Sequence, residues 1–290
     1  MRILIIGASG LVGGNMLRYF RTMGWECMGT HFSFPTADTC FFDTLDLTHP
    51  DNPDIQAFRP HYIINCGALT HVDLCEEDPE RSYKQTVTAQ QNIIQLAQKI
   101  GSKLVYISTD YIFDGNSGPY TEEAKAAPLN AYGRHKWEAE QLTLAAQSDN
   151  LILRITNVYG DEIRGKNFVA RILQQIQNGD TLQFRLPYDQ YATPVNAYDV
   201  ARACFALIQH QKKGVYHIAS TDIYNRVQLA QRILSYFPSL DVRLEICSTS
   251  DLKQKAPRPL WGGLLSSKFL SEFPDFKFSN LDDYLKTKIL

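Results

Sequence analysis

The first half of the chain alternates short apolar runs with longer segments whose apolar residues recur at helical spacing. This order is typical of βαβ units and predicts a parallel sheet covered by helices. The clearest helical segment carries Ile93, Leu96, Ala97 and Ile100 on one face and ends at Gly101, a residue type that commonly terminates helices. Five runs are predicted as strands: Ile3–Ile6, Glu26–Thr30, Tyr62–Asn65, Leu104–Ser108 and Leu151–Arg154.

The alternation weakens in the second half of the chain, after about residue 155. Phe168, Ile172 and Ile176 outline one further helix that ends near Gly179, and a second helix is predicted from Tyr198 to Gln209. No internal repeat or low-complexity linker separates the two halves. Any boundary between domains is therefore expected in an ordinary loop.

Three glycines, Gly7, Gly10 and Gly13, follow the first predicted strand directly. The early ones let the backbone approach a pyrophosphate, the last lets the helix pack close to the strand, and the helix N-terminus offers free N–H groups to an anion. Glycines in a turn can mean only a tight turn, but this position favours dinucleotide binding. We predict an α/β fold, with a Rossmann-type doubly wound parallel sheet over residues 1–155. Residues 156–290 are predicted as mainly a smaller α/β lobe for the substrate, with some segments returning to the first domain.

The end of the second predicted strand bears on which nicotinamide cofactor binds. An acidic residue there would accept hydrogen bonds from the ribose 2′-hydroxyl, but this chain has Thr30, His31 and Ser33. With no carboxylate to repel a 2′-phosphate, NADP(H) is preferred. Because no arginine is visible nearby to hold that phosphate, NAD(H) stays an alternative.

Tyr132 and Lys136 are four positions apart, which places both side chains on one face of a helix. An unperturbed tyrosine has a pKa of about 10 and is a poor acid at neutral pH. A neighbouring ammonium favours the phenolate and lowers that pKa, so the tyrosine can protonate an alkoxide as it forms. The same spacing is common on exposed helices, and only the glycine motif upstream favours the catalytic interpretation.

Hydroxyl and carboxyl side chains follow the fourth predicted strand, at Ser108, Thr109 and Asp110. Ligands of an open parallel sheet bind outside the carboxyl ends of its strands. A hydroxyl at this place can hydrogen-bond a substrate carbonyl and stabilise the charge that develops on its oxygen. The alternative is that one of the two hydroxyls only caps a turn.

Charge and composition narrow the set of partners. With 29 basic and 31 acidic residues interspersed along 290, the chain has a net charge of −2 and no basic face for nucleic acid or a membrane surface. We expect small-molecule partners or a second copy of the chain, as a homodimer. The N-terminal apolar run is too short for a signal sequence and no run is long enough to span a membrane, so a cytoplasmic location is expected.

The cysteines and histidines show no metal-binding pattern. The six cysteines form no C-x-x-C pair and are expected to be reduced and mostly buried. The seven histidines have neither H-x-x-x-H nor Cys/His spacing, so no metal site is predicted.

The order of the glycine motif, STDYIFDG and YGRHK resembles the extended short-chain dehydrogenase/reductases. Within them the chain is most similar to the dTDP-4-dehydrorhamnose reductase family. The resemblance covers nearly the whole chain, through segments such as NCGALTHVDLCEEDPE, RITNVYG, DQYATPVNAYDVA and APRPLWGGLLSSKF. It implies NADP(H)-dependent reduction of the C4 keto group of a nucleotide-linked 6-deoxy sugar, a step towards surface polysaccharide.

The resemblance also implies roles for particular residues. Thr109 is the catalytic hydroxyl, Tyr132 the proton donor, and Lys136 the group that lowers the pKa of Tyr132 and holds the nicotinamide ribose. The implied substrate residues are Thr109, Asp110, Asn157 and Arg258. The implied cofactor residues are Gly7, Ser9, Gly10, Leu11, Val12, Gly13, Thr30, His31, Asp46, Leu47, Cys66, Gly67, Ala68, Tyr132 and Lys136.

Two residues depart from the pattern of the family or superfamily, and a third has an alternative role. Asn157 replaces an aromatic residue that lies against the sugar in the family, which bears on substrate identity. Thr86 stands where the wider superfamily usually has an asparagine that supports the lysine through water. Arg258 can hold a diphosphate bidentately, but an arginine between two prolines can also simply pair with a carboxylate.

Two other functions remain open from the sequence. A nucleotide-sugar epimerase or dehydratase uses the same cofactor fold but keeps the nicotinamide bound through its cycle. A regulatory subunit resembling the beta subunit of methionine adenosyltransferase would act by binding a partner enzyme. The intact Thr109, Tyr132 and Lys136 favour an enzyme.

Overall fold

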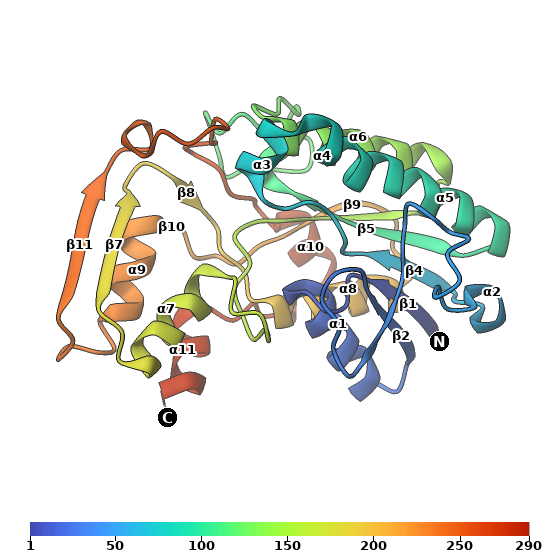
Figure 1. The fold of residues 1–290 in the computed structure, drawn as a ribbon, viewed down its shortest axis with the longest axis horizontal. Coiled ribbons are helices and arrows are strands. Elements are labelled where there is room, and N and C mark those ends of the chain that lie inside the picture. The colour runs from blue at the N-terminus through green and yellow to red at the C-terminus, as the bar shows by residue number, and fades with distance from the viewer. Residues whose placement is uncertain (290) are drawn as a thin grey trace.

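The computed structural model describes residues 1–289, and these residues build a seven-stranded parallel sheet with helices on both faces (Figure 1). All five strands predicted from the sequence are present, as β1, β2, β4, β5 and β6, and the predicted Rossmann-type α/β class is confirmed. The strand order is β3-β2-β1-β4-β5-β6-β9. The strands are β1 (Arg2–Ile6), β2 (Glu26–His31), β3 (Thr39–Phe41), β4 (Tyr62–Asn65), β5 (Lys103–Thr109), β6 (Leu151–Ile155) and β9 (Gly214–Ile218).

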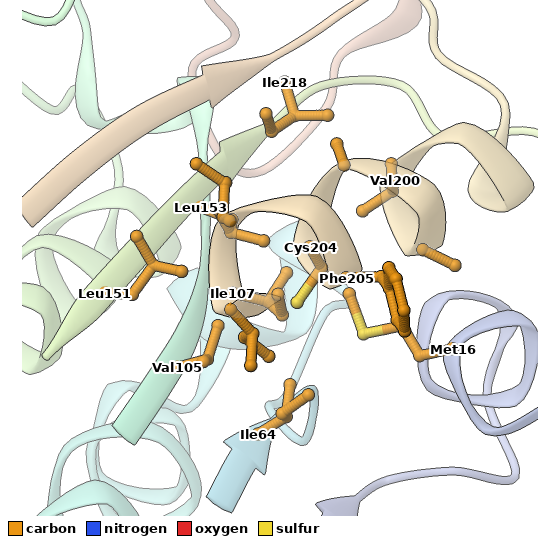
Figure 2. Packing of buried hydrophobic residues seen from close by; sticks show 14 of the residues in the cluster. Met16, Ile64, Val105, Ile107, Leu151, Leu153, Val200, Cys204, Phe205 and Ile218 are labelled. Carbon is orange, nitrogen blue, oxygen red and sulfur yellow. The ribbon is translucent and has the colours of Figure 1, made fainter. Parts of the chain in front are cut away.

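One face of the sheet is covered by α1 (Leu11–Thr22), α8 (Ala197–Gln209) and α10 (Ser267–Glu272). Figure 2 shows Met16 of α1 and Phe205 of α8 packing with strand residues such as Ile107 in the main hydrophobic core. The predicted helix at Tyr198–Gln209 is therefore α8, and it belongs to the layer beside the main sheet.

The opposite face carries α5 (Ala89–Ile100) and α6 (Ala131–Ala146), above the sheet in Figure 1. The predicted apolar stripe of α5 packs there against Leu4 and Ile63, and Gly101 ends the helix in the left-handed conformation. Shorter elements complete this side of the molecule: α2 (Ile55–Phe58), α3 (Val72–Glu77), α4 (Pro79–Tyr83), a π-helical turn at Lys84–Thr88 and a 3-10 turn at Asp110–Ile112.

A second hydrophobic core lies in the C-terminal lobe, at the left of Figure 1. It includes Ile172, Leu182, Ile233 and Leu281. The lobe's elements are α7 (Phe168–Asn178), β7 (Leu182–Pro187), β8 (Tyr191–Ala192), β10 (Tyr224–Asn225), α9 (Arg226–Leu234), β11 (Val242–Cys247), a 3-10 turn at Ser250–Leu252 and α11 (Leu281–Ile289). Strands β7 and β11 pair in parallel, and β8 and β10 pair antiparallel.

The segment after β11 returns to the main sheet and contacts the carboxyl end of β5. The backbone N–H of Gly263 donates to Asp110, and the side chain of Asn130 donates to the carbonyl of Pro257. This return brings parts of the lobe next to the edge where a parallel sheet binds its ligands. No helix within residues 1–289 combines the length and apolarity that crossing a membrane takes.

Candidate active site

The glycine loop between β1 and α1 has the geometry of an anion cradle. Gly7 has a φ of +77°, a conformation that favours glycine, and a Cβ at Gly13 would lie 2.5 Å from the carbonyl oxygen of Gly7. Gly10 caps α1 without any side-chain hydrogen bond, and the first turn of α1 contains no acidic residue. The backbone N–H groups at this helix N-terminus are therefore available to a pyrophosphate, as the sequence predicts.

The turn after β4 lies directly against this loop. A Cβ on Gly7 would meet the backbone nitrogen of Gly67 at 3.0 Å, so the two small residues allow the two chain segments to approach each other. Cys66 and Ala68 flank Gly67, and burial raises the pKa of the Cys66 thiol to about 12. The structure thus brings the two predicted small-residue cofactor segments together.

The end of β2 contains no carboxylate, and its polar side chains are occupied or buried. The Thr30 side chain is 1% exposed, and its hydroxyl has no hydrogen-bond partner among residues 1–289. A ring nitrogen of His31 lies 2.9 Å from the Thr39 hydroxyl. The guanidinium of Arg164, from the loop after β6, lies over the ring of Phe34 at 5.2 Å. An arginine therefore does reach this region, from a part of the chain that is distant in sequence.

Asp46 and Leu47 occupy the loop after β3. The Asp46 carboxylate accepts hydrogen bonds from the backbone and the hydroxyl of Thr48 at 3.0 and 2.7 Å, and these bonds lower its pKa. Leu47 packs against the core beneath α5. The Asp46 carboxylate is thus engaged within its own turn. Leu47 contributes an apolar side chain at this predicted cofactor position.

Tyr132 and Lys136 lie one turn apart at the start of α6, beside the end of β5. Asn130 caps the helix by accepting a hydrogen bond from the backbone of Gly133 at 2.8 Å. The Tyr132 ring meets the Tyr111 ring edge to face, with centroids 5.7 Å apart. The Thr109 side chain at the end of the strand is near enough to the Tyr132 phenol to lower its pKa. The three residues predicted to act together therefore do lie together.

The electrostatics of this trio differ from the sequence-based expectation. Burial raises the pKa of Tyr132, and the nearby Thr109 side chain only partly offsets that rise. Lys136 is 4% exposed, donates to the carbonyl of Ile107 at 2.5 Å and lies over the Tyr106 ring at 4.1 Å. Burial lowers the pKa of Lys136 to about 7. The expected lowering of the Tyr132 pKa by Lys136 is not observed, because desolvation dominates both groups.

Asp110 connects the trio to the returning C-terminal segment. One of its oxygens accepts from the hydroxyl of Thr156 at 2.5 Å and from the backbone of Gly263 at 3.3 Å, and the other accepts from Thr109 at 3.4 Å. Burial raises the pKa of Asp110. Its neighbour Ser108 is 2% exposed, and the Ser108 hydroxyl has no hydrogen-bond partner in residues 1–289.

Asn157 follows directly after this network and has a φ of +38°. Its side-chain oxygen accepts a hydrogen bond from Arg226 of α9 at 2.9 Å. Phe168, at the start of α7, lies beneath two guanidinium groups, those of Arg226 at 5.2 Å and Arg171 at 5.8 Å. Sequence reasoning missed Arg226 and Arg171, since no motif connects α7 or α9 with the residues at the carboxyl ends of the strands.

Arg258 pairs with a carboxylate, which was the alternative considered from the sequence. Its guanidinium lies 2.9 Å from Asp73 and donates to the carbonyl of Ala256 at 3.2 Å, and its side chain is 8% exposed. Thr86, another departure from the superfamily, lies buried in the π-helical turn with a hydroxyl that has no partner in the described part of the chain.

The fold and this edge define a protein of the extended short-chain dehydrogenase/reductase class. The family model described as the RmlD substrate binding domain matches residues 1–286, and the chain belongs to that family.

Similar proteins come from two comparisons. The beta subunit of methionine adenosyltransferase 2 from Xenopus laevis is 31% identical over 252 residues, which cover 83% of this chain and 74% of that one. A dTDP-4-dehydrorhamnose reductase structure from Clostridium acetobutylicum has a TM-score of 0.85 and 28% identity, covering 100% of this chain and 98% of that chain. A Bacillus anthracis dTDP-4-dehydrorhamnose reductase, solved with NADP, has a TM-score of 0.86 and 26% identity, covering 99% and 97%.

Proposed function

We propose that this protein is an NADP(H)-dependent oxidoreductase that reduces the C4 keto group of a nucleotide-linked 6-deoxy sugar, as dTDP-4-dehydrorhamnose reductases do. The product is a 4-hydroxy sugar nucleotide for surface polysaccharide. The observation that carries the proposal is the cluster of Thr109, Tyr132 and Lys136 at the carboxyl end of β5, in the same sheet edge as the glycine loop. Membership of the RmlD family and the likeness to the reductase structures support it.

The residues present fit a nicotinamide dinucleotide. Gly7, Gly10 and the N-terminus of α1 offer backbone N–H groups for the pyrophosphate, with no acidic side chain in that turn. The end of β2 has no carboxylate to repel a 2′-phosphate, and Arg164 lies beside it, so NADP(H) is the preferred cofactor and NAD(H) the second. The similar Bacillus anthracis structure contains NADP.

The proposed roles follow from protonation states and positions. When bound, NADPH supplies the hydride that adds to C4. Tyr132 then gives its phenolic proton to the oxygen that becomes negative, and Thr109 hydrogen-bonds the same oxygen. Burial keeps Tyr132 protonated at neutral pH, which is the state that a proton donor needs. Lys136 is assigned to the nicotinamide ribose. Asp110, Asn157 and Arg258 are assigned to the walls of the sugar-nucleotide site.

A regulatory role is the second candidate, because the beta subunit of methionine adenosyltransferase 2 is a similar protein over 83% of this chain. Such a role requires a partner enzyme and no turnover. A nucleotide-sugar epimerase or dehydratase is the third, and it would return its hydride to the substrate and leave added NADPH unconsumed. A cytoplasmic location and a homodimeric state stay predictions.

The test is the loss of NADPH absorbance when the purified chain is mixed with dTDP-4-dehydro-rhamnose. We expect stoichiometric consumption, and Tyr132→Phe should lower the rate by about 10²- to 10⁴-fold while NADPH binding is retained. Consumption at the same rate in Tyr132→Phe would remove Tyr132 as the proton donor. Tight NADPH binding without turnover would point to a different keto sugar, because of Asn157, or to the regulatory role; absence of turnover with other nucleotide-linked 4-keto 6-deoxy sugars as well would contradict the reductase proposal.

A further inference from the structure

Arg226 reaches the catalytic edge from a distant part of the chain. It is the first residue of α9, yet its guanidinium donates to Asn157, which follows β6 by two residues. The residue before Asn157 is Thr156, whose hydroxyl bonds Asp110, the neighbour of Thr109 in the sequence. The guanidinium also lies over the Phe168 ring at 5.2 Å. Arg226 is thus held in place from two sides, next to the proposed reaction site.

Arg226 has no anionic partner within the described residues. Arg154, Arg232 and Arg258 each lie within 3 Å of a carboxylate oxygen, whereas the acceptor of Arg226 is the neutral amide oxygen of Asn157. A guanidinium has five N–H donors. Arg226 is half-buried, and moving part of its charge out of water has a cost that an anion would offset. The remaining donors are therefore suited to an anionic ligand.

Two further guanidinium groups lie near Arg226. Burial lowers the pKa of Arg226, Tyr111 and Asp110 partly oppose this, and the guanidinium groups of Arg171 and Arg258 lower it further. Asp73 already neutralises Arg258, and no carboxylate within residues 1–289 pairs with Arg171. A site with unneutralised arginines above an aromatic ring favours an anion with several oxygens.

We infer that Arg226, oriented by Asn157 and supported by Phe168, binds an anionic oxygen group of the sugar-nucleotide substrate. The inference rests on the proposed function. Two parts of a sugar nucleotide have this chemistry: the diphosphate, which the proposed 6-deoxy substrate has, and a sugar carboxylate, which only a different sugar would supply.

The experiment is calorimetric titration of the NADP⁺-loaded chain with dTDP, dTDP-glucose and dTDP-glucuronic acid, for the wild type and Arg226→Gln. An about tenfold or greater loss of affinity for all three probes in Arg226→Gln assigns the arginine to the diphosphate. A loss of that size for dTDP-glucuronic acid alone assigns it to a sugar carboxylate. Either result supports the inference, and unchanged affinity for all three overturns it.

Two further variants separate binding from folding and from general charge. Arg226→Lys keeps the charge without the planar fork, so it should recover part of the affinity that Arg226→Gln loses. Arg243→Gln removes one exposed positive charge from β11 and should leave all three affinities within about twofold of the wild type, since surface charges far from a ligand are screened. A loss in Arg243→Gln equal to that in Arg226→Gln would overturn the specific role.

The outcome also separates this inference from the proposed function. If the wild type consumes NADPH with dTDP-4-dehydro-rhamnose but Arg226→Gln binds every probe as well as the wild type does, only the inference fails. If the wild type neither binds the probes nor consumes NADPH, the proposed function fails and the inference fails with it.

Discussion

Arg164 is the residue on which the choice of cofactor depends most directly. Its guanidinium lies over Phe34, three residues beyond the end of β2, where a 2′-phosphate is expected. No hydrogen bond or ion pair engages this guanidinium within the described part of the chain. We predict that Arg164→Gln raises the dissociation constant of NADPH about tenfold and leaves that of NADH within about twofold, because only NADPH carries the phosphate.

Fluorescence titration with the two cofactors measures this effect. Lys166→Gln is the matched control, since it removes an exposed positive charge two residues further along the same loop. An equal loss of NADPH and NADH affinity in Arg164→Gln would contradict the prediction, and would show that the arginine merely shapes the loop.

The site residues that could be predicted from the sequence are those that lie within short motifs. Spacing places Tyr132 and Lys136 on one face of a helix, Thr109 follows a predicted strand, and the family resemblance joins the three in one site. Arg226 and Arg164 could not be predicted, because α9 and the loop after β6 reach that edge only through tertiary packing. The pKa of Tyr132 was also out of reach, since its direction depends on burial and the sequence shows only the neighbouring charge.

Helix α6 positions the proton donor through one close contact. A Cβ at Gly133 would collide with the carbonyl oxygen of Tyr111, in the turn that follows Thr109. We predict that Gly133→Ala moves the first turn of α6 and lowers the rate of NADPH oxidation about tenfold or more, because Tyr132 leaves its place beside Thr109. Overpacking of this kind should also cost about 1–3 kcal/mol of unfolding free energy.

Steady-state kinetics and urea unfolding of Gly133→Ala measure both effects. Gln141→Ala on the exposed side of the same helix should change neither. Wild-type activity in Gly133→Ala would show that the position of Tyr132 does not depend on this contact.

Elements with long buried patterns could be predicted, and the others could not. The core strands are buried along nearly their whole length, and α5 carries a regular apolar stripe. Strand β7 alternates buried Leu182, Phe184 and Leu186 with exposed residues, and this period of two is a strand pattern visible in the sequence. Its partner β11 is exposed at several positions, and β8 and β10 have two residues each, which is too short for a periodic pattern.

A buried polar network connects three elements of the fold, namely β6, α6 and β9. Arg154 of β6 donates to Glu140 of α6 and lies 3.3 Å from His217 of β9. The other ring nitrogen of His217 lies 3.0 Å from the carbonyl of Tyr120, so the neutral ring donates there and accepts from Arg154. His217 is fully buried, and burial, followed by the Arg154 charge, lowers its pKa to about 3.

This lowered pKa predicts acid sensitivity of the entire fold. Between pH 6.5 and about 3 the unfolded chain binds a proton at His217 and the native chain does not, so stability is full above pH 6.5 and falls as the pH decreases. At pH 5 the loss relative to pH 8 should be about 2 kcal/mol from this residue.

Urea unfolding of the wild type and His217→Gln at both pH values isolates the contribution of His217, because the variant lacks the titrating ring. His210→Gln, at an exposed histidine, serves as the control. If His217→Gln loses as much stability on acidification as the wild type does, the prediction is wrong. Carboxylates, and not the His217 ring, would then determine the acid response.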